Sequence, residues 1–212
     1  MSNSSLSEED PAAAARRGPS RRAALLVAAL LALTAWGLDQ LSKWIVETSM
    51  ELGEQIEVLP PVLYWRYHLN PGAAFSIGTD HTWFFTLVMV SVLVFVIWHS
   101  RRLGGSWMWT LALGGLAGGV SGNLTDRLFR PPSYVDGAFE SFGQGHVVDM
   151  IAVPNFAVFN VADSFIVCCM IGICAMMLFG VEIDGIRHRR EDQARQGSDS
   201  EDSGESSEEE RT

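Results

Sequence analysis

The sequence predicts an all-α integral membrane protein, with four transmembrane helices and a small extracytoplasmic β-sheet between spans one and two. Three observations predict this fold: apolar residues cluster in four long blocks, basic residues are distributed unevenly, and the first long connection is rich in strand formers. Of the 212 residues, 48% are hydrophobic, and each block approaches the roughly 20 residues with which a helix crosses a bilayer. The blocks cover residues 23–38, 83–98, 107–124 and 159–181.

The distribution of Lys and Arg predicts the orientation of the four spans. Four Arg residues precede the first block, two lie in the short link between the second and third, and three lie within residues 187–190, in the flank that follows the fourth. Each of the two longer connections holds only two basic residues. Because basic residues concentrate on the cytoplasmic side, we expect a multi-pass membrane protein with both termini in the cytoplasm and both long connections outside. The first block is long for a signal peptide and has no small-residue cleavage site, so we expect an uncleaved span.

The first long connection predicts two short strands followed by a turn. Residues 55–59 and 62–68 flank a Pro60-Pro61 pair and alternate partly between apolar and polar side chains. Such a pattern is typical of two strands joined by a turn. The Asn-Pro-Gly sequence from Asn70 to Gly72 is a strong turn signal. We therefore expect a small sheet at the membrane surface.

The charge distribution separates a membrane domain from two tails. Net charge is −10, but residues 191–212 alone contain nine acidic and two basic residues and no apolar core-forming pattern. Such a segment is expected to be disordered and solvated. We expect a cytoplasmic, largely disordered tail over residues 1–22, a four-span domain over residues 23–186, and an acidic disordered tail over residues 187–212. No basic face or motif for nucleic acid is present.

Unusual polar residues share the outer end of the predicted bundle. Intramembrane charge is costly, so charged residues there are either paired or functional. Asp39 with Lys43, and Asp126 with Arg127, can form neutralised pairs, which favours a structural or substrate-positioning role over direct catalysis. Glycines at four-residue steps in residues 114–122 favour close packing between these helices.

Asp149 and Asp163 differ because neither has a cation nearby in sequence. His146 lies close to Asp149, but no other His or Cys completes a metal site, so we expect neither a metal nor another cofactor. Two carboxylates that approach closely share one proton, and such a pair can activate water for amide hydrolysis. Asp163 also suits a helix N-terminus, a capping role that is compatible with catalysis.

Five motifs occur in a characteristic order. They are Asp39-Gln-Leu-Ser-Lys43, Asn70-Pro-Gly-Ala-Ala-Phe75, Gly118-Gly-Val-Ser-Gly-Asn-Leu-Thr-Asp-Arg127, Val147-Val-Asp149 and Phe159-Asn-Val-Ala-Asp163. As a set, they resemble the motifs of bacterial prolipoprotein signal peptidase, also called signal peptidase II. The resemblance extends from about Ala23 to Val181. Met150 stands where the family often has an aromatic residue, and the connection from Leu128 to Gly145 is long for the family.

The resemblance implies an aspartic peptidase that removes the signal peptide of diacylglyceryl-modified prolipoproteins, just before the lipidated Cys. It implies membrane lipids as surroundings and globomycin-type compounds as inhibitors. Asp149 and Asp163 match the catalytic dyad. The supporting and substrate-contacting positions match Asp39, Lys43, Asn70, Gly72, Asn123, Asp126, Arg127, Asn160 and Ala162.

Two other functions are compatible with intramembrane carboxylates. A transporter or proton relay uses such groups, but four spans without internal repeats and carboxylates away from the midplane are not typical of one. A non-catalytic scaffold would use the polar residues only for pairing, so exchanging Asp149 or Asp163 would change stability more than activity.

Overall fold

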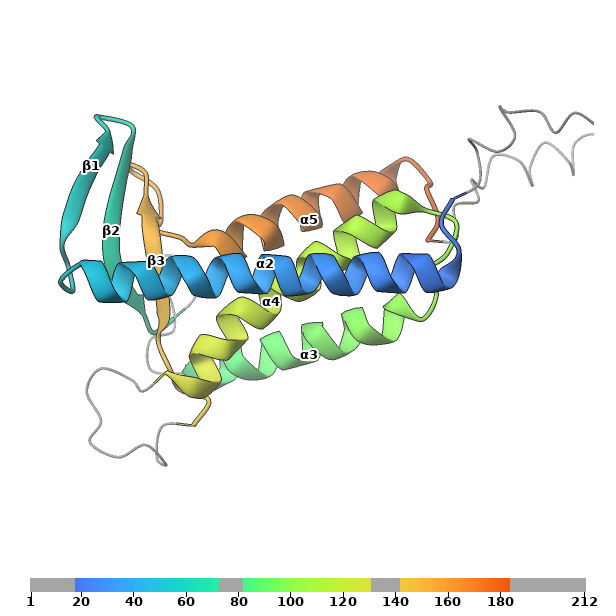
Figure 1. Ribbon diagram of the computed structural model, residues 1–212, viewed down its shortest axis with the longest axis horizontal. Helices are drawn as coiled ribbons and strands as arrows, with labels where there is room; N and C mark the ends of the chain where they lie inside the picture. Colours follow the sequence, from blue (N-terminus) through green and yellow to red (C-terminus); the bar gives the residue numbers. More distant parts are fainter. Residues whose placement is uncertain (1–17, 73–81, 131–141, 184–212) are drawn as a thin grey trace, which may run out of the picture.

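Four long helices lie side by side, with a small sheet at one end of the bundle (Figure 1). The computed structural model describes residues 18–72, 82–130 and 142–183. Residues 1–17 of the expected N-terminal tail, the expected C-terminal tail and the middle of the long connection after Leu128 lie outside these residues, whereas Arg21 and Arg22 of the expected N-terminal tail belong to a helix. The described chain begins and ends at the end of the bundle opposite the sheet. The helices are α2 (Arg21–Ser49), α3 (Thr82–Ser100), α4 (Trp107–Phe129) and α5 (Val161–Leu178), and the strands are β1 (Gln55–Leu59), β2 (Leu63–Asn70) and β3 (Val147–Ala152).

Each helix corresponds to one predicted apolar block, but α2 is much longer than its block. It begins after Ser20, whose hydroxyl accepts a hydrogen bond from the Ala23 N–H at 3.3 Å. Its 29 residues span about 44 Å at about 1.5 Å per residue. From the sequence, Asp39 and Lys43 were expected to lie at the end of the first span. They instead lie inside one continuous helix. Within the described ranges, α2, α3 and α5 are long and apolar enough to cross a membrane.

The central helix is α4, which packs against the other three. Its glycines allow this close packing, as predicted. A Cβ atom added to Gly114 or Gly118 would lie 2.8 or 2.6 Å from a carbonyl oxygen of α2. A Cβ atom on Gly119 would lie 2.7 Å from the Ala162 carbonyl oxygen of α5. Gly114 and Gly118 thus allow α2, and Gly119 allows α5, to pack closely against α4.

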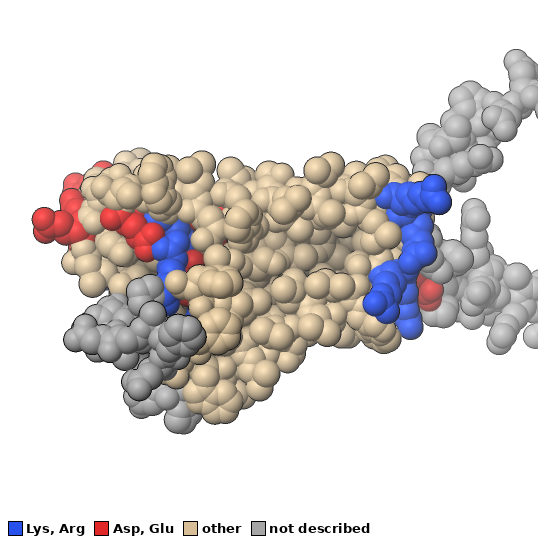
Figure 2. All heavy atoms as spheres, turned by 60° about the horizontal axis from the view of Figure 1, so that its bottom comes forward, with Lys and Arg blue, Asp and Glu red and all other residues tan. Residues whose placement is uncertain are grey.

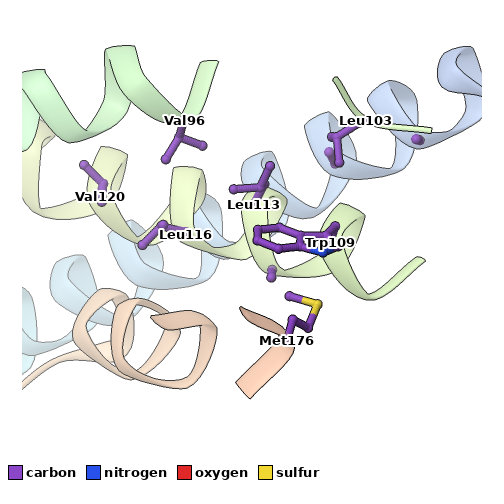
Figure 3. Packing of buried hydrophobic residues seen from close by; sticks show 10 residues of the cluster. Val96, Leu103, Trp109, Leu113, Leu116, Val120 and Met176 are labelled. Carbon is purple, nitrogen blue, oxygen red and sulfur yellow. The ribbon is translucent and has the colours of Figure 1, made fainter. Parts of the chain in front are cut away.

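Apolar side chains fill the space between the helices (Figure 3). Leu113 and Leu116 of α4 lie between Val96 of α3 and Met176 of α5 in this cluster. Trp109 lies at one end of the cluster, and its indole Nε1 donates a hydrogen bond to the Val181 carbonyl at 2.8 Å. Burial of these side chains holds the bundle together along most of its length.

On the face that Figure 2 shows, charged residues lie at both ends of the molecule, and the band between them is almost free of Lys, Arg, Asp and Glu. One end carries exposed Arg21, Arg22, Arg101 and Arg102. The helix surfaces between the ends expose large apolar side chains such as Leu30, Val94 and Ile171. This distribution is typical of a helical bundle surrounded by lipid.

The sheet is antiparallel, with the order β1-β2-β3. The sequence analysis predicted β1 and β2 but not β3, which comes from the connection between α4 and α5. Val148 and Met150 of β3 pack on Val46 of α2. Because alternate residues of a strand face opposite ways, Asp149 faces away from this cluster. Its cross-strand partner on β2 is His68.

Candidate functional site

A cavity of about 540 Å³ lies where the sheet meets the helices. The side chains that line it fall into two groups. The polar group is Asn70, Asn123, Arg127, Asp149, Asp163 and Ser164. The apolar group includes Phe85, Met89, Phe156, Val158, Ile166 and Val167. A few polar groups in an otherwise apolar cavity are typical of a ligand-binding site.

Asp149 enters the cavity from the middle of β3 and is 1% exposed. Its Oδ2 accepts a hydrogen bond from Asn70 Nδ2 at 3.0 Å, and its Oδ1 accepts one from Asn160 Nδ2 at 2.8 Å. Burial and the charge of Asp163 raise the pKa of Asp149 to about 7, although the two amide donors and Lys43 oppose this shift. Burial and the neighbouring carboxylate thus favour the protonated form of Asp149.

Asp163 lies in the first turn of α5 and has a defined orientation. Its Oδ2 accepts a hydrogen bond from the Asn160 N–H at 3.1 Å, while Asn160 Oδ1 accepts one from the Asp163 N–H at 2.9 Å. This reciprocal pair is a capping box, with Asn160 as the N-cap residue. The remaining oxygen, Oδ1, accepts a hydrogen bond from Asn123 Nδ2 at 2.7 Å. Asp163 thus has the helix-capping role considered from the sequence and also lines the cavity.

Asn123 and Asn160 connect the two aspartates. Asn160 Nδ2 donates to Asp149 and also to Asn123 Oδ1, at 3.0 Å. Lys43 Nζ donates to the same oxygen of Asn123 at 2.9 Å. Since Asn123 Oδ1 receives two donors, its Nδ2 is directed at Asp163. Asn160 therefore donates to both carboxylates, from its side chain to Asp149 and from its backbone N–H to Asp163, whereas Asn123 donates to Asp163.

A fully buried ion network lies behind the cavity. Lys43 Nζ is 2.8 Å from Asp39 Oδ2 and 2.7 Å from Asp126 Oδ2, and none of the three side chains is exposed. Asp39 Oδ1 accepts the N–H of Ala162 at 2.9 Å, and Asp126 Oδ2 accepts the N–H of Val148 at 3.2 Å. Those two N–H groups belong to the residues just before Asp163 and Asp149. The network therefore holds the backbone beside each aspartate.

The predicted pairing of Asp126 with Arg127 is wrong. Asp126 instead pairs with Lys43 and with Arg130, whose Nε lies 2.8 Å from Asp126 Oδ1. Consecutive residues of a helix point in different directions, whereas residues four apart share a face. That spacing was the signal for Arg130, which the sequence analysis missed. Gln40 was also missed, and its Nε2 donates to both Asp39 and Asp126 at 3.2 Å.

Arg127 holds the turn that follows β2. Its Nη1 donates to the Pro71 carbonyl at 2.8 Å, and its Nη2 donates to the Gly72 carbonyl. Within the turn, Asn70 Oδ1 accepts a hydrogen bond from the Gly72 N–H at 3.0 Å. The turn thereby presents Asn70 to Asp149.

The expected site residues thus form two layers around the same point. Asn70, Gly72, Asn123, Arg127, Asp149 and Asp163 line the cavity. The second layer supports the first through hydrogen bonds and packing, and it consists of Asp39, Lys43, Asp126, Asn160 and Ala162.

The parts of the chain that the structure describes hold no group of three His, Cys, Asp or Glu side chains that could bind a metal ion. The pKa of His146 is lowered by burial and by the nearby charges of Arg127 and His68.

The chain is similar to known proteins in sequence and in fold. A family model described as signal peptidase (SPase) II matches residues 31–179. A lipoprotein signal peptidase of Leifsonia xyli is 43% identical over 166 residues, covering 78% of this chain and 73% of the relative. One from Rhodococcus jostii is 38% identical, covering 85% and 87%. A solved structure titled as a bacterial membrane enzyme has a TM-score of 0.60 and 26% identity, covering 77% of this chain and 92% of that one.

Proposed function

Because the chain belongs to the signal peptidase II family, we propose that it is a membrane aspartic endopeptidase acting on diacylglyceryl-modified prolipoproteins. It cuts the amide bond on the N-terminal side of the lipidated Cys and so releases the signal peptide. The observation that carries this proposal is the pair of carboxylates, Asp149 and Asp163, which line one cavity and both accept hydrogen bonds from Asn160.

The mechanism uses one proton shared by Asp149 and Asp163. The ionised carboxylate takes a proton from a water molecule, whose oxygen attacks the scissile carbonyl carbon. The protonated carboxyl donates to the carbonyl oxygen, which gives a neutral tetrahedral intermediate. The C–N bond then breaks as the nitrogen of the departing Cys takes a proton from the protonated carboxyl and the other carboxylate takes a hydroxyl proton from the intermediate, which becomes the carboxylic acid of the signal peptide. The pair titrates as a unit, so neither residue holds the proton alone.

The apolar side of the cavity is proposed to bind the lipid part of the substrate. Phe85 and Met89 of α3 and Ile166 and Val167 of α5 line it. The outer surfaces of the same helices are apolar. A diacylglyceryl group can therefore stay in contact with lipid while its Cys reaches the dyad.

The membrane arrangement follows from the positions of the charges. We propose that α2, α3, α4 and α5 all span the inner membrane and that the sheet lies on the extracytoplasmic side. The Arg-rich end of the bundle supports a cytoplasmic position for both termini. If the Arg-rich end lies in the cytoplasm, Asp149 and Asp163 lie on the extracytoplasmic side, where the signal peptide of an exported lipoprotein is accessible.

A cleavage assay on a matched pair of precursors tests the proposed function. The purified protein is given a prolipoprotein that carries the diacylglyceryl group and the same precursor without it, and products are identified by mass spectrometry. We expect one cut before the modified Cys, none in the unmodified precursor, and inhibition by globomycin. Cutting of both precursors alike would contradict the proposed specificity, and cutting of neither would contradict the peptidase function.

The transporter alternative is tested separately in proteoliposomes. The proposed peptidase gives no gradient-driven uptake of protons or solutes. Uptake that is lost on changing Asp149 or Asp163 would favour the transporter.

A further inference from the structure

A row of alternating charges runs from the buried network to the protein surface. On α2, Asp39, Lys43 and Glu47 are spaced four residues apart and share one face. Asp126 of α4 and Arg130, the C-cap residue that follows α4, are also four residues apart. Arg130 contacts both helices, because its Nε is 2.8 Å from Asp126 Oδ1 and its Nη1 forms an ion pair with Glu47 Oε1. Glu47 and Arg130 thus extend the network beyond the residues that line the cavity.

Four donors bind the Asp126 carboxylate, two at each oxygen. Oδ1 accepts from Arg130 and, at 3.2 Å, from Gln40. Oδ2 accepts from Lys43 at 2.7 Å and from the Val148 N–H at 3.2 Å. The bond to Val148 is one of the longer ones in this set. Any rotation of the Asp126 carboxylate toward Lys43 would therefore weaken it first.

The Val148 N–H is next to Asp149 in the chain. Because Asp149 lies in the same strand, a shift of β3 at Val148 moves its carboxylate relative to Asp163. Arg130 opposes this shift by holding Asp126 Oδ1 on the side away from Lys43. Glu47 in turn holds the guanidinium, whose planar shape lets one side chain bind two carboxylates at fixed angles.

We propose that Glu47 and Arg130 are positioning residues for Asp149, acting through Asp126 and the Val148 N–H. This inference rests on the proposed function, since it takes Asp149 to be catalytic. Neither side chain lines the cavity, so they do not act by touching the substrate.

The electrostatic surroundings of Arg130 agree with this role. Burial lowers the pKa of Arg130, but the hydrogen bond to Glu47 and the charge of Asp126 outweigh that effect and leave it above its ordinary value. The side chains of Arg130 and Glu47 are 21% and 29% exposed. Such partly exposed pairs contribute little to folding, so their loss can alter the site without unfolding the protein.

The test compares Arg130→Gln, Glu47→Gln and the double variant in the cleavage assay. We expect Arg130→Gln to lower kcat by on the order of tenfold, while KM stays within about twofold and the melting temperature changes little. Arg130→Lys should be intermediate, because an ammonium group keeps the positive charge but lacks the planar guanidinium that binds the two carboxylates at fixed angles. The double variant should be no worse than Arg130→Gln, since the two residues act as a unit.

Matched controls lie on the sheet. Arg66 and Glu57 are exposed residues of β2 and β1, and Arg66→Gln and Glu57→Gln should leave kcat unchanged. An unchanged kcat in Arg130→Gln would overturn the inference, as would a fall in kcat that only follows loss of folded protein. Asp149→Asn in the same series separates the two proposals: an active Asp149→Asn contradicts the proposed function, whereas an inactive one with normal Arg130→Gln contradicts only the positioning role.

Discussion

Lys43 Nζ donates a 2.9 Å hydrogen bond to Asn123 Oδ1, and this bond determines which way the Asn123 amide faces. The oxygen is directed at the buried ammonium, so the Nδ2 group is directed at Asp163, 2.7 Å from its Oδ1. A cation inside the bundle thereby controls a donor inside the cavity. The buried ion network and the candidate dyad are parts of one hydrogen-bonded unit.

Asn123→Asp separates these two functions of Asn123. The new carboxylate can still accept from Lys43, but it cannot donate to Asp163 and adds a like charge beside it. A hydrogen bond to a charged group contributes about 1.5–3 kcal/mol, so we expect kcat to fall by roughly ten- to a hundredfold. Steady-state cleavage measures this change. Asn155→Asp, in an exposed turn, is the control, and an equal loss in both variants would contradict the account.

Asn160→Ser separates helix capping from the donor function. Ser and Asn are similarly good N-cap residues, so the first turn of α5 should remain and the melting temperature should change little. Ser lacks the Nδ2 group that donates to Asp149 and Asn123, so cleavage should be strongly reduced. Thermal unfolding and cleavage are measured on the same preparation. Normal cleavage in Asn160→Ser would show that the donor is dispensable.

Gly122 is required because its α-carbon lies against the buried ion pair. A Cβ atom there would lie 2.5 Å from Asp39 Oδ2 and 3.1 Å from Ala162 Cβ. We expect Gly122→Ala to cost about 1–3 kcal/mol of stability through overpacking and to reduce cleavage, because Asp39 must move away from the Ala162 N–H. The control is Gly37→Ala in α2, where nothing lies within 4 Å of the added atom. Equal thermal stability of the two variants would contradict the close packing.

The pKa of Asp149 predicts the direction of a pH dependence. Its folded-state pKa of about 7 is above the ordinary value of 3.8. Between these values the unfolded chain releases a proton that the folded protein retains, so Asp149 makes the protein less stable as pH rises from 4 to 7 and has no further effect above 7. The Asp149→Asn variant has no ionisable group at this position, so its stability lacks this contribution to the pH dependence.

Melting temperatures of the wild type and Asp149→Asn measured on both sides of this range check the prediction. The difference should favour the wild type more at acidic than at alkaline pH. A difference that is constant or has the opposite sign would contradict the shift. Cleavage should also fall above pH about 7, because the dyad then loses its shared proton.

The helices and two of the strands could be predicted because their signals are local. Four apolar blocks became four helices, and the strand formers around Pro60-Pro61 became β1 and β2. The glycine spacing in α4 also predicted close packing correctly. In contrast, β3 pairs with a strand about 80 residues earlier. Its sequence, Val147 to Ala152, is nearly all apolar and shows no alternation, so only the tertiary partner reveals the strand.

The residues that form the site could be predicted more easily than the partners that each of them binds. Orientation by positive charge gathered the polar residues at one end, and the lack of a local cation singled out Asp149 and Asp163. In the folded protein both carboxylates nevertheless interact with Lys43, which is far away in sequence. The partners of Asp126 depend on how α2 and α4 face each other. Sequence spacing within one helix does not contain that information.

The most direct measurement is single-turnover cleavage of a diacylglyceryl-modified precursor by the wild type, Asp149→Asn and Asp163→Asn. Both variants keep a side chain of nearly the same shape, so each should fold and bind the precursor. Thermal unfolding and a binding assay verify these two conditions. The account predicts that neither variant cleaves detectably while the wild type cuts before the lipidated Cys. Wild-type cleavage rates in either variant would contradict the two-aspartate mechanism.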